Sequence, residues 1–207
     1  MTRPIIPSDG ELLRLMMAGD DHAFTMVYRR HQGPVYRFAL LMSGSATIAE
    51  DATQETFLVL IRGTDRYDPE RGPLGSYLFG ITRNVVLRRL ERERSYVPLV
   101  EESEDGEEIL LTQLVTEDNP FIDCARMESI SLVRHAVLAL PPRYREVVVL
   151  CDFEEMSYVE AALVLGCPVG TVSSRLYRGH IMLLERLRAM AKLDSASPDA
   201  QYLRCFA

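Results

Sequence analysis

A short segment near the C-terminus combines hydroxyl and guanidinium side chains at helical spacing. It reads CPVGTVSSRLYRG over residues 167–179. Spacings of three, one and three residues place on one helix side Thr171, Ser174, Arg175 and Arg178. Arginine binds phosphate or guanine, and small hydroxyl residues let a helix come close to base edges. This face is typical of a DNA-reading helix, and a solvated basic helix face is the alternative.

The residues just before this helix predict a steep turn into it. Ser157 and Glu160 match a capping box, in which each side chain binds an unpaired backbone N–H at a helix start. Gly166 suits the left-handed conformation that ends a helix, and Pro168 suits the opening of the next one. Two helices joined by so short a connection cross steeply, so a helix-turn-helix is expected.

The second helix of this pair also has an apolar side. Spacings of three and four residues connect Val172, Leu176, Gly179, Leu183, Leu187 and Met190. This stripe is expected to pack inward and to leave the arginine face exposed. Residues 169–192 include five Lys or Arg and one acidic residue, which favours DNA binding over a solvated hairpin.

The overall charge is acidic, but it is unevenly distributed. The 207-residue chain has a net charge of −7, which by itself argues against a nucleic-acid partner. Residues 101–123, however, carry nine acidic side chains and no Lys or Arg, so the remainder is mildly basic. We interpret this run as a solvated linker, with a DNA-mimicking strip as the alternative.

Apolar residues recur at three and four on both sides of the acidic run. We therefore expect an all-α protein with two small helical domains joined by an acidic flexible linker, the C-terminal one containing the helix-turn-helix. The expected helices span residues 10–18, 21–42, 45–62, 74–94, 125–140, 143–153, 158–165 and 169–191. The predicted divisions are a domain at 1–97, a linker at 98–124, a domain at 125–193 and a tail at 194–207.

Other functional classes find little support in the sequence. The cysteines and histidines lack metal-ligand spacing, and we find neither a nucleophile with a base nor a phosphate-binding loop. We therefore expect no enzyme activity, no cofactor and no metal. No apolar run has the length of a membrane span and the N-terminus lacks a secretory signal, so a cytoplasmic location is expected.

The segment AEDATQETFLVLIR at residues 49–62 predicts a helix with two distinct sides. One side carries Asp51, Gln54, Glu55 and Leu58. Phe57, Leu60 and Ile61 are expected to turn into the core. An acidic and amide face with one exposed leucine suits a basic protein surface, although solvated helices often have the same pattern.

Residues 65–92 combine a polar loop with aromatic and basic side chains. The residues of interest are Tyr67, Tyr77, Arg83, Asn84, Arg88 and Arg89. Aromatic rings that stack on unpaired bases, with guanidinium groups for phosphates, are suited to holding a melted single strand. Leu74, Leu78, Ile81 and Val85 form the expected buried stripe, and packing of Tyr77 beside it is the alternative.

These segments together resemble one family. The runs LPPRYREV at 140–147, SYVE at 157–160 and GCPVGTVSSRLYR at 166–178 are similar to the promoter −35-binding domain of bacterial sigma factors. Residues 49–62 are similar to the polymerase-binding helix of that family, and residues 65–92 to its −10-recognising and melting segment. With two such domains, the chain resembles the extracytoplasmic-function (ECF) group.

The resemblance implies a factor that binds core RNA polymerase, recognises and melts promoter DNA, and starts transcription. The implied partners are the clamp coiled coil of the largest polymerase subunit, the flap of the second-largest subunit, promoter DNA and an anti-sigma factor. Implied −35 contacts are Thr171, Ser173, Ser174, Arg175, Tyr177 and Arg178. Implied −10 contacts are Tyr67, Tyr77, Arg83, Asn84, Arg88 and Arg89. Implied polymerase contacts are Asp51, Gln54, Glu55 and Leu58.

The sequence departs from the family pattern at two positions. Tyr77 stands where the family often has tryptophan, and Ser173 stands at a position that is frequently basic. The second departure predicts one phosphate contact fewer and a low affinity for an isolated −35 element. A stand-alone helix-turn-helix regulator, which would bind duplex DNA without polymerase, is the alternative function.

Overall fold

The computed structural model describes residues 7–96 and 130–196, and all regular structure in these residues is helical. This confirms the expected all-α class. The predicted linker at 98–124 lies outside the described residues. The N-terminal half contains α1 (Asp9–Met17), α2 (Asp21–Ser43), α3 (Ala46–Arg62), the short 3₁₀ turn η1 (Thr64–Arg66) and α4 (Leu74–Tyr96).

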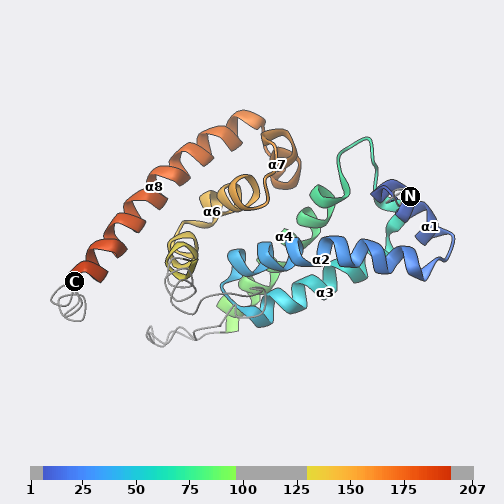
Figure 1. Cartoon of the computed structure of the whole chain (residues 1–207), viewed down its shortest axis with the longest axis horizontal. Coiled ribbons are helices and arrows are strands. Elements are labelled where there is room, and N and C mark those ends of the chain that lie inside the picture. Colours follow the sequence, from blue (N-terminus) through green and yellow to red (C-terminus); the bar gives the residue numbers. More distant parts are fainter. Residues whose placement is uncertain (1–6, 97–129, 197–207) are drawn as a thin grey trace, which may run out of the picture.

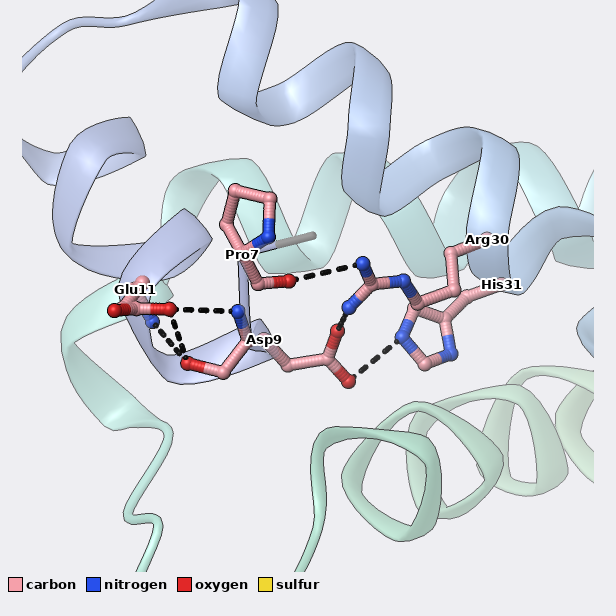
Figure 2. Close-up of polar contacts among 6 residues, drawn as sticks. Pro7, Asp9, Glu11, Arg30 and His31 are labelled. Atoms are coloured by element: carbon pink, nitrogen blue, oxygen red, sulfur yellow. Dashed lines mark hydrogen bonds and ion pairs between the residues drawn. The ribbon is translucent and has the colours of Figure 1, made fainter. Parts of the chain in front are cut away.

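A capping box begins α1, and a charged cluster fixes this helix against α2. Ser8 accepts a hydrogen bond from the Glu11 backbone N–H, while the Glu11 carboxylate accepts one from the Ser8 backbone N–H. Figure 2 shows the Asp9 carboxylate between Arg30 and His31, with the His31 Nε2 at 3.0 Å from Asp9 Oδ2. The cluster therefore connects the first turn of α1 to the middle of α2.

The predicted apolar stripe of α4 is confirmed. Leu74, Leu78 and Val85 are buried, and Ile81 is partly buried. The prediction for Ile61 on α3 was wrong, because its side chain is 50% exposed. Leu60 points into the core, and Ile61 is turned about 100° away from it around the helix axis.

The C-terminal half contains a helical segment at 130–138, α6 (Pro142–Val148), the π-helical turn η2 (Val149–Phe153), α7 (Tyr158–Leu165) and α8 (Val169–Ala196). The sequence predicts one regular helix over 143–153, but the helix widens into a π-turn. Val147, Val148, Val149 and Leu150 are all fully buried. Four successive residues cannot all face inward from one side of a regular helix that has solvent on its other side, so this segment is surrounded by protein.

The two halves share an apolar core. Figure 1 shows α6, α7 and α8 on one side of the pair formed by α2 and α4. Phe79 and Val86 of α4 belong to the same buried cluster as Leu150 and Val164 of the C-terminal half. Contacts between α4 and α7 and between α2 and η2 join the halves directly.

The described residues contain neither a single helix suited to span a membrane nor a cluster of metal-ligating side chains. Taken singly, none of the described helices is long and apolar enough to cross a membrane, while α7 and α8 together pass that test but are bent by 100°. Over the same residues, no group of three or more His, Cys, Asp or Glu side chains is placed to hold a metal ion.

Candidate nucleic-acid interface

The connection between α7 and α8 has helix-turn-helix geometry. The predicted capping box is present. The Glu160 carboxylate accepts a hydrogen bond from the Ser157 backbone N–H at 2.8 Å, and the Ser157 hydroxyl accepts one from the Glu160 backbone N–H at 3.3 Å. Gly166 ends α7 in the left-handed conformation, with a φ of 62°. The bend of 100° between the two helices lies in the range of helix-turn-helix motifs. The sequence prediction of this motif is therefore confirmed.

Close packing against α6 fixes the orientation of α8. Val172 is fully buried and Leu176 nearly so, as their apolar spacing predicts. Gly179 lies so near α6 that a Cβ at this position would come within 2.8 Å of Val148 Cγ2. The inward side of α8 is thus held against α6, and its opposite side faces solvent.

The exposed side of the motif forms a basic pocket of about 220 Å³. It is lined by Arg143, Tyr144, Thr171, Ser174, Arg175 and Arg178. A hydrogen bond from Arg178, helped by the positive charges of Arg143 and Arg178, lowers the pKa of the Tyr144 hydroxyl. The pocket is therefore a site of concentrated positive charge.

Sequence reasoning missed Arg143 and Tyr144 as members of this surface. Arg143 lies 4.8 Å from the centre of the Tyr144 ring, measured from its guanidinium carbon. Both come from the first turn of α6, outside the helix-turn-helix. Both residues lie in the LPPRYREV run, which pointed to the family but not to a DNA contact by these two side chains.

Of the predicted −35 residues, Thr171, Ser174, Arg175 and Arg178 line this pocket, whereas Ser173 and Tyr177 do not. Ser173, Ser174, Tyr177 and Arg178 are exposed, and Thr171 and Arg175 are partly buried. The Ser174 hydroxyl donates to the Thr171 carbonyl at 3.1 Å, so it retains acceptor capacity.

A second cavity, of about 340 Å³, lies where the loop before α4 meets α7. Tyr67, Tyr77 and Asn84 line it, together with Leu163 and Val164 of α7. The Tyr67 and Tyr77 ring centres are 5.5 Å apart, and the Tyr67 hydroxyl donates to the Gly72 carbonyl at 3.0 Å. The structure therefore brings together three of the predicted −10 residues.

The three arginines predicted to contact the −10 strand each have a carboxylate partner. Arg83 binds Glu146 of α6 through two hydrogen bonds of 3.1 and 3.2 Å. Arg88 lies 2.6 Å from Glu55, and Arg89 lies 2.7 Å from Asp51. Two predicted polymerase contacts on α3 thus pair with two predicted DNA contacts on α4.

The outer side of α3 presents amide and apolar groups. Gln54 is exposed and Leu58 is 48% exposed. Ile61, which was expected in the core, lies one turn farther along the same helix side and extends this surface.

Comparison with known families identifies both halves. The description "Sigma-70 region 2" matches residues 27–96, and "Sigma-70, region 4" matches residues 130–180. The chain is 33% identical over 183 residues to the ECF RNA polymerase sigma factor SigM of Mycobacterium tuberculosis, covering 87% of this chain and 85% of that protein. It is 28% identical to SigW of Bacillus subtilis, covering 85% and 95%.

Further relatives are similar in sequence or in fold. SigE of Mycolicibacterium smegmatis is 35% identical over 159 residues, and the chain spans 59% of its length. The structure of CnrH in complex with the cytosolic domain of CnrY matches with a TM-score of 0.60 and 26% identity, over 92% of this chain and 100% of that one. RpoE from Bartonella quintana, in complex with the anti-sigma factor NepR, matches with a TM-score of 0.63 and 24% identity, over 80% and 96%.

Proposed function

We propose a separate task for each half of this chain. The chain belongs to the extracytoplasmic-function group of bacterial RNA polymerase sigma factors and directs the initiation of transcription. The C-terminal half reads the −35 element, and the N-terminal half holds the opened −10 strand. The basic pocket on a helix-turn-helix bent by 100° is the observation that carries this assignment.

The start of α8 enters the −35 major groove. Thr171, Ser173, Ser174 and Tyr177 border the base edges, while Arg175 reads guanine and Arg178 binds phosphate. Arg143, on the opposite wall of the pocket, grips the phosphate backbone from α6. Three arginines around one pocket make an anion the fitting occupant.

The 340 Å³ cavity in the N-terminal half receives an unstacked base of the −10 strand. Tyr67 and Tyr77 offer stacking surfaces, and the exposed Asn84 offers amide donors and acceptors. Arg83, Arg88 and Arg89 follow the strand's phosphates once their carboxylate partners are exchanged. Melting then follows from capture of the unpaired base.

The polymerase docks on α3 and on an apolar surface of the C-terminal half. Gln54, Leu58 and Ile61 form the α3 surface for the clamp coiled coil, flanked by Asp51 and Glu55. The flap of the second-largest subunit binds the C-terminal half. Since RpoE from Bartonella quintana is solved in complex with the anti-sigma factor NepR, an anti-sigma factor is proposed for this chain too, in the cytoplasm where the polymerase acts.

Run-off transcription with core RNA polymerase on a library of genomic promoters tests the function. We expect specific transcripts only when both the chain and core enzyme are present. Tight, specific binding to duplex DNA by the chain alone, without any transcript from the reconstituted enzyme, would indicate a stand-alone regulator instead.

Arg175→Ala tests the reading face of α8. We expect the binding free energy at promoters that depend on the −35 sequence to weaken by about 1–3 kcal/mol, because a bidentate contact to guanine contributes that much. Arg186→Ala is the matched control, since it removes the same charge from an exposed position farther along α8. Equal losses in both variants would assign Arg175 to general electrostatics.

Leu58→Asp tests the α3 surface without breaking an ion pair. We expect reduced co-purification with core polymerase, because a carboxylate would replace an exposed apolar contact. Leu15→Asp, at a similarly exposed position on α1, is the control and should assemble normally. Normal assembly of the Leu58 variant would show that the polymerase does not dock on this surface of α3.

A further inference from the structure

The basic pocket is built by two helices. Arg143 and Tyr144 come from the first turn of α6, and the other four lining residues come from α8. Tyr144 alone among the six is buried, with 8% of its surface exposed. A buried side chain with a polar end needs a hydrogen-bond partner, so the contacts of the Tyr144 hydroxyl show which group it orients.

The backbone of Tyr144 lies against α8 beside Arg178. A Cβ added at Gly179, the residue after Arg178, would lie 3.6 Å from the Tyr144 carbonyl oxygen and 3.7 Å from its Cβ. Val147 and Val148, which follow on α6, are fully buried. Tyr144 is therefore fixed relative to the stretch of α8 that carries Arg178.

Two guanidinium groups converge on the Tyr144 side chain. The Arg143 guanidinium carbon lies 4.8 Å from the ring centre, within the range of cation–π contacts. The hydroxyl accepts a hydrogen bond from Arg178, which is the main cause of its lowered pKa, and a weaker one from Arg143. One phenol thus joins an arginine of α6 to an arginine of α8.

The pocket arginines differ from those near the −10 cavity in the charge of their partners. Arg83, Arg88 and Arg89 each bind a carboxylate. In the part of the chain that the structure describes, none of the three pocket arginines forms an ion pair with a carboxylate. A neutral hydroxyl orients a guanidinium without cancelling its charge, and it leaves most of the N–H groups unoccupied. The Tyr144 contact therefore leaves Arg178 able to bind an anion.

Holding Arg178 in place lowers the entropy that DNA binding costs. Its side chain is exposed, and a free arginine side chain gives up much of its rotamer freedom when it binds a partner. An arginine that is already oriented in the free protein gives up less, so its contact with DNA is stronger. The hydroxyl of Tyr144 supplies this orientation from a buried position.

We propose that Tyr144 is a positioning residue for −35 recognition, whose hydroxyl directs Arg178 at a phosphate of the promoter. A phosphate held between Arg178 and Arg143 sets the depth of α8 in the major groove, and thereby the distance of Arg175 from the bases. The recognition surface then includes the first turn of α6 as well as the helix-turn-helix. This inference rests on the −35 role proposed for the pocket above.

Tyr144→Phe tests this role because it removes the hydroxyl and keeps the buried ring. It is combined with Arg178→Ala in a double-mutant cycle, which measures whether the two side chains act as one unit. Tyr158→Phe is the matched control, since Tyr158 is an exposed tyrosine of α7 outside the pocket. Each variant is assembled with core RNA polymerase, and its affinity is measured for a labelled duplex of a −35-dependent promoter obtained by run-off transcription.

We expect Tyr144→Phe to bind the promoter duplex about fivefold more weakly, the loss typical of one hydrogen bond. Its melting temperature and helical circular dichroism should equal those of the wild type. In the Arg178→Ala background, the same substitution should cause no further loss, because the side chain that the hydroxyl orients is absent. Tyr158→Phe should match the wild type.

A second measurement needs no DNA. NMR of the tyrosine ring carbon that carries the hydroxyl follows the ionisation of Tyr144 in the full chain. Because the hydrogen bond from Arg178 lowers the pKa of Tyr144, this signal should titrate at a higher pH in Arg178→Ala than in the wild type. An unchanged titration would show that Tyr144 does not hold Arg178, and would overturn the proposal.

Three binding results would also overturn it. These are wild-type affinity of Tyr144→Phe, additive losses in the cycle, and an equal loss in Tyr158→Phe. Failure of the wild-type holoenzyme to bind any promoter would contradict the −35 role instead. The NMR titration would then still decide whether Tyr144 holds Arg178.

Discussion

Individual arginines on α4 differ in how readily they can exchange a protein partner for DNA. Arg88 and Glu55 are 53% and 37% exposed, and an exposed pair of this kind contributes only about 0–1 kcal/mol. Its exchange for a phosphate is therefore nearly neutral. Arg83 binds a carboxylate that is almost fully buried, and breaking that pair leaves an uncompensated charge. For the −10 role proposed above, Arg83 has to leave a buried carboxylate before it can bind phosphate, whereas Arg88 has only to leave an exposed one.

A single glycine sets how closely α8 approaches α6, and Gly179→Ala tests it. The added Cβ would lie 2.8 Å from Val148 Cγ2, a fully buried and β-branched side chain that cannot rotate away cheaply. Overpacking costs about 1–3 kcal/mol, and the better helix propensity of alanine returns about 1 kcal/mol. We expect a lower melting temperature, by about 2–4 °C per kcal/mol lost.

The control for this substitution lies on the same helix. A Cβ at Gly170 would meet nothing within 4 Å, so Gly170→Ala should leave the melting temperature equal or slightly higher. If Gly179→Ala were as stable as the wild type, α8 would have room to move away from Val148, and the close approach would not fix its orientation.

Helix α1 is held both by a short apolar face and by a charged cluster. Leu12 and Leu13 are its buried residues, and the Asp9 carboxylate adds contacts to Arg30 and His31 (Figure 2). The hydrogen bond with His31 is the main cause of the lowered pKa of Asp9, and the two positive partners add to it. Docking of α1 on α2 therefore depends on an ionised carboxylate.

Asp9→Asn should make the first helix dock less tightly at neutral pH. Since folding lowers the pKa of Asp9, its contribution is complete above the ordinary aspartate pKa and is lost as pH falls below that value and through the lowered pKa. We expect a loss of about 1 kcal/mol at pH 7, or about 2–4 °C in melting temperature. Once the pH lies below the lowered pKa of Asp9, the variant and the wild type should melt together. A constant difference at all pH values would assign the effect to packing.

Sequence predicts the elements better than their surroundings. The capping box at Ser157 and the glycine cap at Gly166 are local patterns, and both helix ends were found where the pattern places them. The π-turn after Val148 was missed, because the local apolar pattern of this segment is also compatible with a regular helix. The exposure of Ile61 was also missed. Helical spacing gives the angle of a side chain around the helix axis, but it does not show how much of the helix surface neighbouring elements bury.

Pairing between distant residues could be predicted least. Types and spacing selected Arg83 and Glu55 as contacts for other molecules. Nothing in a single sequence shows that Arg83 meets Glu146, which lies 63 residues away. The basic pocket also needed Arg143 from α6, and only the packing of α6 against α8 brings it beside Arg175. Tertiary structure, not periodicity, assembles such sites.

At the scale of the whole molecule, the boundary between the halves contains one carboxylate with an unsatisfied oxygen. Arg37 contacts Glu154 Oε2, while Oε1 is buried without a hydrogen-bond partner in the described residues. Burial raises the pKa of Glu154 to about 7, against the opposing effect of Arg37 and with a small addition from Glu155. The assembled molecule thus holds a proton at Glu154 that a solvated glutamate would release.

Glu154→Gln should therefore remove the part of the pH dependence of the melting temperature that comes from this carboxyl group. Because folding raises the pKa of Glu154, its stabilising protonated state is complete below the ordinary glutamate pKa and is lost as pH rises through about 7. The wild-type melting temperature should fall over that window, and the glutamine variant should exceed it by about 2–4 °C at pH 8, with equal values near pH 4. Glu155→Gln, at the exposed neighbouring position, should keep the wild-type profile. Parallel profiles for the wild type and the Glu154 variant would show that this carboxylate is already ionised and paired with Arg37 across the boundary.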